Sequence, residues 1–590
     1  MTLRSAYALL ALVTLGFSSL AKAQQSTIVV IDGITEPSPP PPPPPVPQSD
    51  TPPEKSVALS GPATFSISGT VVSTTTGTPL DRAEVSLSTS GPRGSQLAHS
   101  ITTENGSFRF DRLQAGKYRL DASRRGYIAA GYQDHDGFVT AIVTGRNLSS
   151  DGIRLELLPT AIIGGVITDD SGEPIGGAQV RLFRLDQYTG EAKIVGAGQD
   201  TTDDTGTYEF ARLKAGTYYL GVSASPWYAF HPGRKTDASG NPLPDDQQPH
   251  SPLDVAYAMT FYENATDSAS ASAIALNAGD RVELNLSMHA VPAIHIQVTL
   301  RTAEQASSRG IVIPMLSQDV FGEQQMQPGG VTWMTTRNDN QTIGEFGGVA
   351  PGHYVLRQFQ QQGGGDGPRT ASIDLTTNQT VDFTAASVSG VDVSGKVVMA
   401  SGAKLPNRTR ISLVPADGGS SRENTTVDAD GAFALHSVSP GRYDVQLGAA
   451  GVQLAVAQMA ATGADFEGSH ITVASEPVLL AATLASGSTT IAGFARRDGK
   501  PLGRAMILLA PRDPNASTQL IRRDQSDSDG SFTLTGVVPG SYTLVAIEDG
   551  WTLDWARREV LAPYLSRGVK VRFTGQKSLD LPAAVEVQPR

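Results

Sequence analysis

The stretch Asp527–Leu544, DSDGSFTLTGVVPGSYTL, contains two turn signals, each followed by residues that alternate between apolar and polar. The Asp-x-Asp-Gly portion supplies turn formers and a glycine, Gly530, that can take a positive φ, so a strand can reverse into an antiparallel partner. Beyond it, Phe532 and Leu534 share one face of a strand. A Pro-Gly turn then leads into Tyr542 with the same alternation. The stretch therefore predicts two antiparallel strands with one face in a core and the other in water.

Altered forms of this stretch recur earlier in the chain, at a period close to the length of one domain. Each copy closes with an aromatic residue and a later tyrosine, ten residues apart in four copies and eight in the third. These pairs are Phe108 and Tyr118, Tyr208 and Tyr218, Phe346 and Tyr354, Phe433 and Tyr443, and Phe532 and Tyr542. Every copy except the third also opens with a glycine inside an apolar strand. The opening glycines are Gly69, Gly165, Gly395 and Gly493. A spacing this regular in diverged sequence indicates a shared backbone.

The closing segment of each well-preserved copy predicts the same turn and the same corner. In Greek-key sandwiches, a tyrosine near the start of a strand often buries its ring and bonds its hydroxyl to the backbone of the preceding connection, which is called a tyrosine corner. The expected turn and corner residues are Gly106, Tyr118, Gly206, Tyr218, Gly431, Tyr443, Gly530 and Tyr542. Each copy would then form about seven short strands in two packed antiparallel sheets.

Length and composition favour tandem all-β domains of the Greek-key sandwich type. A chain of 590 residues is longer than one hydrophobic core usually serves. Its 61 glycines and 38 prolines suit short strands and turns better than long helices. The sequence has no cysteine, so neither disulfides nor thiolate metal sites can hold the domains together. The predicted sandwiches span residues 63–158, 159–291 with an inserted aromatic loop, 292–389 in a diverged form, 390–486 and 487–590.

The N-terminal residues predict export from the cytoplasm. Arg4 precedes an apolar run that ends near Phe17, and Ala21-Lys22-Ala23 fits the cleavage site of a secretory signal peptide over residues 1–23. A membrane anchor is the weaker interpretation because the run is too short to span a bilayer. The mature protein is therefore expected in the periplasm, on the outer surface or in the medium, with no transmembrane segment.

A proline-rich linker is predicted over residues 24–62. Consecutive prolines from Pro39 to Pro45 forbid helix and sheet and favour an extended polyproline II spacer. The alternative is a ligand for a proline-binding module.

Four sequence patterns together resemble the carboxypeptidase regulatory-like domain. They are G-x-V in the opening strand, G-x-P-L/I-x-x-A-x-V-x-L after it, D-x-D/T-G-x-F/Y at the turn and P/A-G-x-Y before the corner tyrosine. The resemblance covers every copy well except the third. It implies a transthyretin-like β-sandwich, related to Cna-B-type and starch-binding-like modules and often grouped with carbohydrate-binding-like folds. The chain is also similar to multi-copy exported proteins of acidobacteria, which implies an exported and non-catalytic protein.

The sequence holds no pattern typical of a catalytic or metal centre. Its nine histidines are scattered, with no H-E-x-x-H pattern, and it has no G-x-S-x-G elbow, Walker loop or dinucleotide-binding fingerprint. The turns at Asp428 and Asp527 resemble the start of a calcium loop, but the twelfth position is Ser439 or Val538 instead of glutamate, which favours a plain hairpin. Lys396 lies where Cna-B modules place an isopeptide lysine, and a solvated lysine is the preferred interpretation. We predict no enzyme activity, no cofactor and no metal.

Charge and aromatic residues restrict the choice of partner. A net charge of −12 without a long basic run argues against nucleic acid. Sugars stack on flat aromatic faces, so aromatic residues outside the alternating strands are candidate ligand-binding residues. They are Trp227, Tyr228, His231 and Tyr262 in and after a proline-flanked loop, and Trp551 and Trp555 in a second cluster. The alternative is that these rings pack over sandwich ends or domain joints. Glycan binding is the leading hypothesis, and the alternative is an architectural spacer or assembly partner among envelope proteins.

Overall fold

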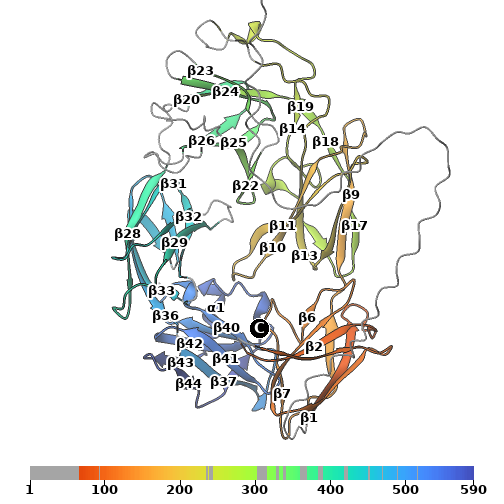
Figure 1. Cartoon of the computed structure of the whole chain (residues 1–590), viewed down its shortest axis with the longest axis vertical. Coiled ribbons are helices and arrows are strands. Elements are labelled where there is room, and N and C mark those ends of the chain that lie inside the picture. Colours follow the sequence, from red (N-terminus) through yellow and green to blue (C-terminus); the bar gives the residue numbers. More distant parts are fainter. Residues whose placement is uncertain are drawn as a thin grey trace, which may run out of the picture. The chain divides into compact units, whose positions relative to one another are not determined.

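The computed structural model describes residues 65–590 except 92–93, 234, 236, 238–242, 302–314, 327–330, 337–340, 359–368, 383–389, 417–422, 450–451, 453, 468, 488 and 515. The predicted signal peptide and proline-rich linker, residues 1–23 and 24–62, lie outside these residues. Residues Ser56–Arg590 form one compact unit. Strands dominate this unit, which confirms the prediction of an all-β fold (Figure 1).

Within the described residues, the strands form five successive sandwiches of paired sheets. In the first, a sheet in the order β4-β1-β8 faces one of β3-β2-β5-β6 with β7 beside β5. Its strands are β1 (Phe65–Ser73), β2 (Glu84–Thr89), β3 (Gln96–Ile101), β4 (Ser107–Leu113), β5 (Gly116–Ser123), β6 (Ala130–Gly131), β7 (Ile142–Thr144) and β8 (Ile153–Leu157). The opening strand β1 pairs antiparallel with β4 and parallel with β8. The boundaries given above for the five domains stay predictions.

The second sandwich repeats this pattern and adds a two-stranded sheet, β14-β19. Its opening strand β9 lies between β12 and the short strands β17 and β18, and β10, β11, β13, β15 and β16 make the other layer. The strands are β9 (Ala161–Asp169), β10 (Gln179–Asp186), β11 (Lys193–Thr201), β12 (Thr207–Leu213), β13 (Gly216–Ser223), β14 (Val255–Tyr257), β15 (Thr260–Phe261), β16 (Ile274–Leu276), β17 (Arg281–Glu283), β18 (Leu286–Met288) and β19 (Ala290–Pro292). The long connection from β13 to β14 carries the aromatic loop.

The third and fourth sandwiches each pair two sheets of four or five strands. The sheets are β23-β24-β20-β27 with β22-β21-β25-β26, and β31-β28-β36-β33 with β30-β29-β32-β35-β34. The third contains β20 (Ile294–Arg301), β21 (Met315–Val320), β22 (Glu323–Met326), β23 (Val331–Thr336), β24 (Gln341–Val349), β25 (Gly352–Gln358), β26 (Arg369–Leu375) and β27 (Gln379–Asp382). The fourth contains β28 (Val391–Met399), β29 (Arg410–Pro415), β30 (Glu423–Thr426), β31 (Ala432–Val438), β32 (Gly441–Gly448), β33 (Leu454–Thr462), β34 (Ala464–Glu467), β35 (His470–Val473) and β36 (Val478–Ser486).

In the fifth sandwich the last strand, β45, joins the two layers. It pairs in parallel with both β37 and β42, so nine strands form one continuous sheet. The strands are β37 (Thr489–Arg497), β38 (Lys500–Pro501), β39 (Met506–Pro511), β40 (Arg522–Gln525), β41 (Ser531–Val537), β42 (Gly540–Ile547), β43 (Val569–Phe573), β44 (Ser578–Asp580) and β45 (Val585–Gln588).

A short α-helix, α1 (Arg558–Leu565), interrupts the strands before β43. It packs the buried Leu561 against a cluster around Trp551. No pattern in the sequence predicts this helix, because eight residues with Pro563 among them are too few to show a helical period. The 3-10 helices are η1 (Asp245–Gln247), η2 (Ser268–Ser270), η3 (Thr518–Leu520) and η4 (Gly550–Thr552). Searching the described residues for a helix with the length and apolar character of a membrane span finds none.

The opening glycine lies directly opposite the closing aromatic residue across the first pair of strands. The pairs are Gly69 with Phe108, Gly165 with Tyr208, Gly395 with Phe433 and Gly493 with Phe532. A Cβ added to Gly69 would lie 2.0 Å from the carbonyl oxygen of Ile153 on the neighbouring strand β8. Glycine is therefore required for the close approach of β1 to β8.

In the third copy the glycine of this pair lies on the closing strand instead of the opening strand. This explains the shorter interval between the aromatic residue and the tyrosine. Gly344 lies on the closing strand, opposite Val298 on the opening strand. Phe346 pairs with Ile296, in the position that Phe110 holds in the first copy. Phe346 thus occupies the next inward position of the closing strand, two residues nearer the tyrosine.

All five copies contain the hydrogen bond that defines a tyrosine corner. Each hydroxyl donates to the backbone carbonyl four residues earlier, over 2.8 to 3.0 Å. The bonds join Tyr118 to Gln114, Tyr218 to Lys214, Tyr354 to Ala350, Tyr443 to Ser439 and Tyr542 to Val538. The rings are buried. The turn glycines Gly106, Gly206, Gly431 and Gly530 have φ values of 72°, 72°, 85° and 79°. The same tyrosine corner is therefore built in all five copies, and the same glycine turn in the four copies where that turn is described.

Candidate functional site

The proline-flanked loop after β13 presents aromatic side chains to solvent. The side chain of Trp227 is 85% exposed and that of Phe230 is 60% exposed. The Trp227 ring meets the half-buried Tyr228 edge-on, with centroids 5.8 Å apart and planes at 89°. The amide of Phe230 donates to the carbonyl of Leu253 over 2.8 Å, which joins the loop to the segment before β14. One broad indole face is thus left uncovered on a loop that is fixed at its base.

A chain of four titratable side chains fixes this base to the third sandwich. His231 Nδ1 lies 2.9 Å from one carboxylate oxygen of Asp254, and His295 Nε2 lies 2.8 Å from the other. His295 Nδ1 lies 2.6 Å from the fully buried carboxylate of Glu345. Both partners of His295 are carboxylates, so an imidazolium ring can donate a hydrogen bond from each nitrogen. Burial acts to lower the pKa of His295, but the two carboxylates outweigh it and raise that pKa above its ordinary value.

Sequence reasoning missed Asp254, His295 and Glu345. Glu345 precedes the inward-facing Phe346, so alternation predicts that its side chain meets water. The segment of the second sandwich that carries Asp254 covers this outer face instead. No local pattern could have indicated this, because the burial comes from another sandwich.

The cavity under the loop is too small for a sugar. It is lined by Ala224–Pro226, His231, Val255–Tyr257 and Gly348–Ala350, and it has room for about one water molecule. Any glycan at this site must therefore bind on the exposed ring faces. Tyr262 does not contribute such a face, because its half-buried ring packs against the core of the second sandwich.

The second aromatic cluster lies at a joint between sandwiches. Trp551 is only 7% exposed, and it stacks on His135 of the first sandwich with centroids 5.4 Å apart and planes at 6°. Phe138 covers it at 4.9 Å. The guanidinium of Arg523 lies 4.1 Å from the centroid of the half-buried Trp555. This placement favours the alternative considered for these rings, packing at a domain joint.

The acidic turn at Asp428 satisfies its carboxylate within the turn. Asp428 Oδ1 accepts hydrogen bonds from the amides of Asp430 and Ala432 over 2.9 and 2.7 Å, the bonding of an aspartate to the backbone of its own turn. Lys396 is exposed on β28. In the part of the chain that the structure describes, no group of three or more His, Cys, Asp or Glu side chains is placed to hold a metal ion. The absence of a metal and of a cofactor stays a prediction.

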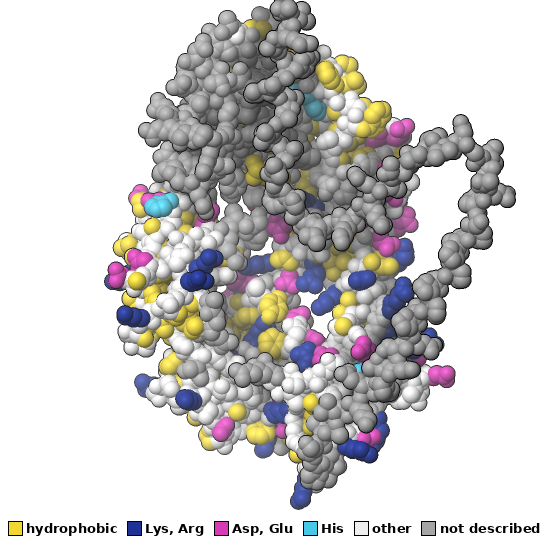
Figure 2. All heavy atoms as spheres, in the orientation of Figure 1, with side chains coloured by type: hydrophobic (Ala, Val, Ile, Leu, Met, Phe, Trp, Pro, Cys, Tyr) yellow, Lys and Arg dark blue, Asp and Glu magenta, His cyan; other side chains and the backbone are white. Residues whose placement is uncertain are grey.

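Charges of both signs share the visible surface. Figure 2 shows basic and acidic side chains interspersed among the coloured residues of this face, with no extended patch of either sign. The exclusion of nucleic acid as a partner remains a prediction from net charge.

A family model described as the carboxypeptidase regulatory-like domain matches residues 66–140 and 162–232. These two segments are carboxypeptidase regulatory-like domains. They lie in the first and second sandwiches, and the second segment includes the loop from Trp227 to His231. The carboxypeptidase regulatory-like domains share the turn glycine and the tyrosine corner with the copies at Gly431 and Gly530, which the match does not reach. No curated protein matches the sequence.

Several solved structures of bacterial proteins match the chain over long segments at low similarity. The streptococcal ancillary pilin is 9% identical, with 54% of this chain and 98% of that chain covered and a TM-score of 0.19. The minor pilin GBS52 of Streptococcus agalactiae is 14% identical, with 42% and 100% covered and a TM-score of 0.20. The TIE protein of Bacillus anthracis is 10% identical, with 71% and 74% covered and a TM-score of 0.16. Scores this low carry no inference about what the present chain binds.

Proposed function

We propose that this is an exported, non-catalytic protein that binds a carbohydrate or carbohydrate-containing surface polymer through the loop around Trp227. The observation that carries the proposal is the indole of Trp227, exposed over 85% of its surface yet placed edge-on against Tyr228. Tryptophan and tyrosine, which combine a large apolar ring with a polar group, are enriched at binding interfaces. The apolar face of a sugar ring is a suitable partner for a flat indole. Export follows from the predicted signal peptide.

The base of the loop is held before any ligand arrives. His231 and Phe230 are bonded to Asp254 and Leu253 on the neighbouring segment. A loop that is already ordered loses little conformational entropy on binding, so more of the stacking energy contributes to affinity. This supports a binding role for the loop over a role as a passive connection.

The proposal is tested with the full chain on a glycan array and in polysaccharide pull-downs. Trp227→Ala should weaken binding about tenfold or more, because covering an aromatic side chain contributes roughly 1.5–3 kcal/mol. Phe494→Ala is the matched control, because Phe494 is a 47% exposed ring on the fifth sandwich. Absence of any ligand for the wild type, or equal binding by both variants, would reject carbohydrate recognition through this loop.

The alternative function is an architectural spacer or assembly partner in the cell envelope. The specific observation in its favour is that the rings around Trp551 pack between the first and fifth sandwiches. In this case Trp227→Ala leaves the assembly of the protein with its envelope partners unchanged, whereas deletion of a whole sandwich disrupts that assembly.

A further inference from the structure

The asparagines of this sequence are unusually placed. Nine of the twelve begin the triplet Asn-x-Ser or Asn-x-Thr, in which x is not proline. Serine and threonine together make up 105 of the 590 residues, so chance would give about two such triplets among twelve asparagines. The triplet is the acceptor signal for N-linked glycosylation in exported proteins. The nine triplets begin at Asn105, Asn147, Asn264, Asn285, Asn340, Asn378, Asn407, Asn424 and Asn515, of which Asn340 and Asn515 lie outside the described residues.

Turn geometry alone explains the triplet at Asn105. This residue precedes the turn glycine Gly106, in the position that Asp529 holds in the fifth copy. Its side-chain oxygen accepts from the amide of Ser107 over 3.3 Å, as Asp529 Oδ1 accepts from the amide of Ser531 over 2.9 Å. The asparagine and the serine therefore form this turn without any need for a second role.

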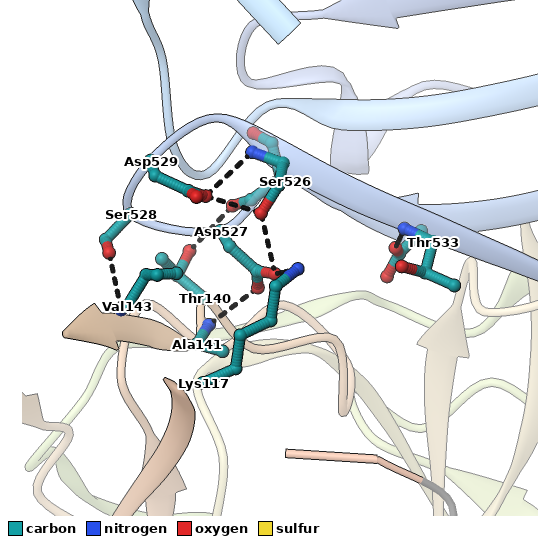
Figure 3. Close-up of polar contacts among 11 residues, drawn as sticks. Lys117, Thr140, Ala141, Val143, Ser526, Asp527, Ser528, Asp529 and Thr533 are labelled. Atoms are coloured by element: carbon teal, nitrogen blue, oxygen red, sulfur yellow. Dashed lines mark hydrogen bonds and ion pairs between the residues drawn. The ribbon is translucent and has the colours of Figure 1, made fainter. Parts of the chain in front are cut away.

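The equivalent turn of the fifth copy is covered by the first sandwich. Lys117 Nζ lies 2.6 Å from Asp527 Oδ2, and the amide of Val143 donates to the hydroxyl of Ser528 over 2.9 Å (Figure 3). A turn covered in this way leaves no room for a glycan, and no asparagine occurs in it.

Two other triplets lie in exposed loops. Asn147 and Ser149 are both exposed in the connection from β7 to β8, and Asn264 and Thr266 are both exposed after β15. Each asparagine has a φ of 65°. This left-handed conformation accounts for asparagine at both positions, but it does not account for the hydroxyl residue two positions later. Each loop thus presents the whole triplet to solvent.

A further exposed triplet lies on an edge strand. Asn424 and Thr426 belong to β30, which is the outermost strand of its sheet. Residues two apart in a strand share one face, and both of these side chains are exposed. The amide and the hydroxyl are therefore presented together.

The triplet at Asn285 uses its polar groups within the fold. Asn285 Oδ1 accepts from the amide of Val166 over 2.8 Å, and the hydroxyl of Ser287 donates to the carbonyl of Asp169 over 3.0 Å. An enzyme that acts on the folded chain must break these bonds to engage both groups. This triplet is therefore an internal control for the exposed ones.

We propose that the exported chain is N-glycosylated at Asn147, Asn264 and Asn424. In the transfer, the side-chain nitrogen of asparagine forms a bond to the anomeric carbon of a sugar that is activated as a glycosyl diphosphate. The bond from that carbon to the diphosphate oxygen breaks, the diphosphate leaves with the electron pair, and the amide nitrogen gives up one proton. The inference rests on export, which is part of the proposed function, and it is independent of carbohydrate binding at Trp227.

Mass spectrometry of the full chain purified from its native host tests the proposal. We expect the intact mass to exceed that of residues 24–590 by whole sugar units, and peptide spectra to place these units on the three exposed asparagines. Asn147→Gln should remove one increment of added mass. Ser149→Ala should remove the same increment, because it keeps the asparagine but destroys the triplet. Asn285→Gln is the matched control and should leave the added mass unchanged.

The intact mass also separates failure of this inference from failure of export. A chain that has lost residues 1–23 but carries no added mass would overturn glycosylation and leave export intact. A chain that retains residues 1–23 without added mass would contradict export, and the inference with it. Sugar on Asn285 and on none of the three exposed asparagines would contradict the assignment of the sites.

Discussion

At the scale of single residues, the space available for a Cβ atom determines how strictly a turn requires glycine. Gly431 and Gly402 lie in the same sandwich with φ values of 85° and 69°. A Cβ at Gly431 would lie 2.1 Å from the carbonyl oxygen of Val397, whereas a Cβ at Gly402 would meet nothing within 4 Å. Both residues carry the cost of positive φ for a side chain, but only Gly431 adds a collision with backbone.

We therefore expect Gly431→Ala to destabilise the protein more than the matched control Gly402→Ala. The control should cost about 1 kcal/mol from φ alone, and Gly431→Ala roughly 1–3 kcal/mol more because the turn must move away from Val397. Scanning calorimetry of the full chain measures both as shifts of the transition to which the fourth sandwich contributes. Equal shifts would show that backbone conformation, and not contact with Val397, explains the glycine.

These residue types were predictable because their causes are local. A turn that needs positive φ, and a corner tyrosine that bonds four residues back, are each determined within a few neighbouring residues. The same reasoning placed Phe346 in the position of Phe108, whereas it occupies the position of Phe110. The pairing of Gly344 with Val298 causes this difference, and it cannot be seen from the closing strand alone. Local signals thus identified the repeated turn and corner, but the predicted pairing of the strands around them was wrong, because β40 pairs with β39 whereas β41 pairs with β37.

At the scale of elements, the segment before β14 and the sheet of the third sandwich are joined through His295, and this joint should depend on pH. The pKa of His295 is raised in the folded protein. A raised pKa means that the folded state holds the proton more tightly, so the stabilisation is complete below the unfolded value of about 6.5 and is lost as pH rises through the folded value. We expect the melting temperature of the joint to fall as pH rises above about 6.5.

His295→Gln tests this dependence. The variant should be less stable at low pH and should lose the slope of melting temperature against pH above about 6.5. His353→Gln is the control, because His353 lies 2.6 Å from Asp374 in an exposed pair of the same sandwich. Exposed pairs contribute little, so this control should follow the wild type. A wild-type melting curve that does not change over this pH range would contradict the role of His295.

The joint around Arg523 connects elements of three sandwiches. Its guanidinium lies over Trp555 of the fifth sandwich at 4.1 Å and over Phe138 of the first at 5.1 Å. It also donates to the carbonyl of Tyr188, on the connection from β10 to β11 of the second, over 3.2 Å. Arg523→Lys keeps the charge but removes the planar group that can contact all three at once.

For Arg523→Lys we expect faster amide hydrogen exchange around Phe138 and Tyr188, with the sandwich cores still protected. Arg82→Lys is the control, since the side chain of Arg82 is 89% exposed. Unchanged exchange at both segments in Arg523→Lys would mean that the aromatic contacts alone hold the joint.

At the scale of the whole molecule, the sequence predicted repeated sandwiches but not their contacts. Each copy carries its own turn and core signals, so repetition is visible without a structure. Asp527 and Lys117 are more than 400 positions apart, and each has the residue type of an ordinary exposed turn or strand. Trp551 likewise suggested a ligand face because its covering residues, His135 and Phe138, belong to another copy. When a sandwich far away in the sequence covers a surface, the residues of that surface carry no local pattern that predicts their burial.

The fourth and fifth sandwiches should unfold together, because they share core residues. Ala455 and Ala485 lie on β33 and β36 of the fourth sandwich, yet they are buried within the hydrophobic core of the fifth. Ala485→Glu would place a carboxylate in that core, so we expect the shared calorimetric transition to split or to shift to lower temperature. Ala481→Glu is the matched control, because Ala481 is exposed on the same strand. If Ala485→Glu melts as the control does, the two cores are energetically separate despite their contact, and each sandwich is stable through its own two sheets alone.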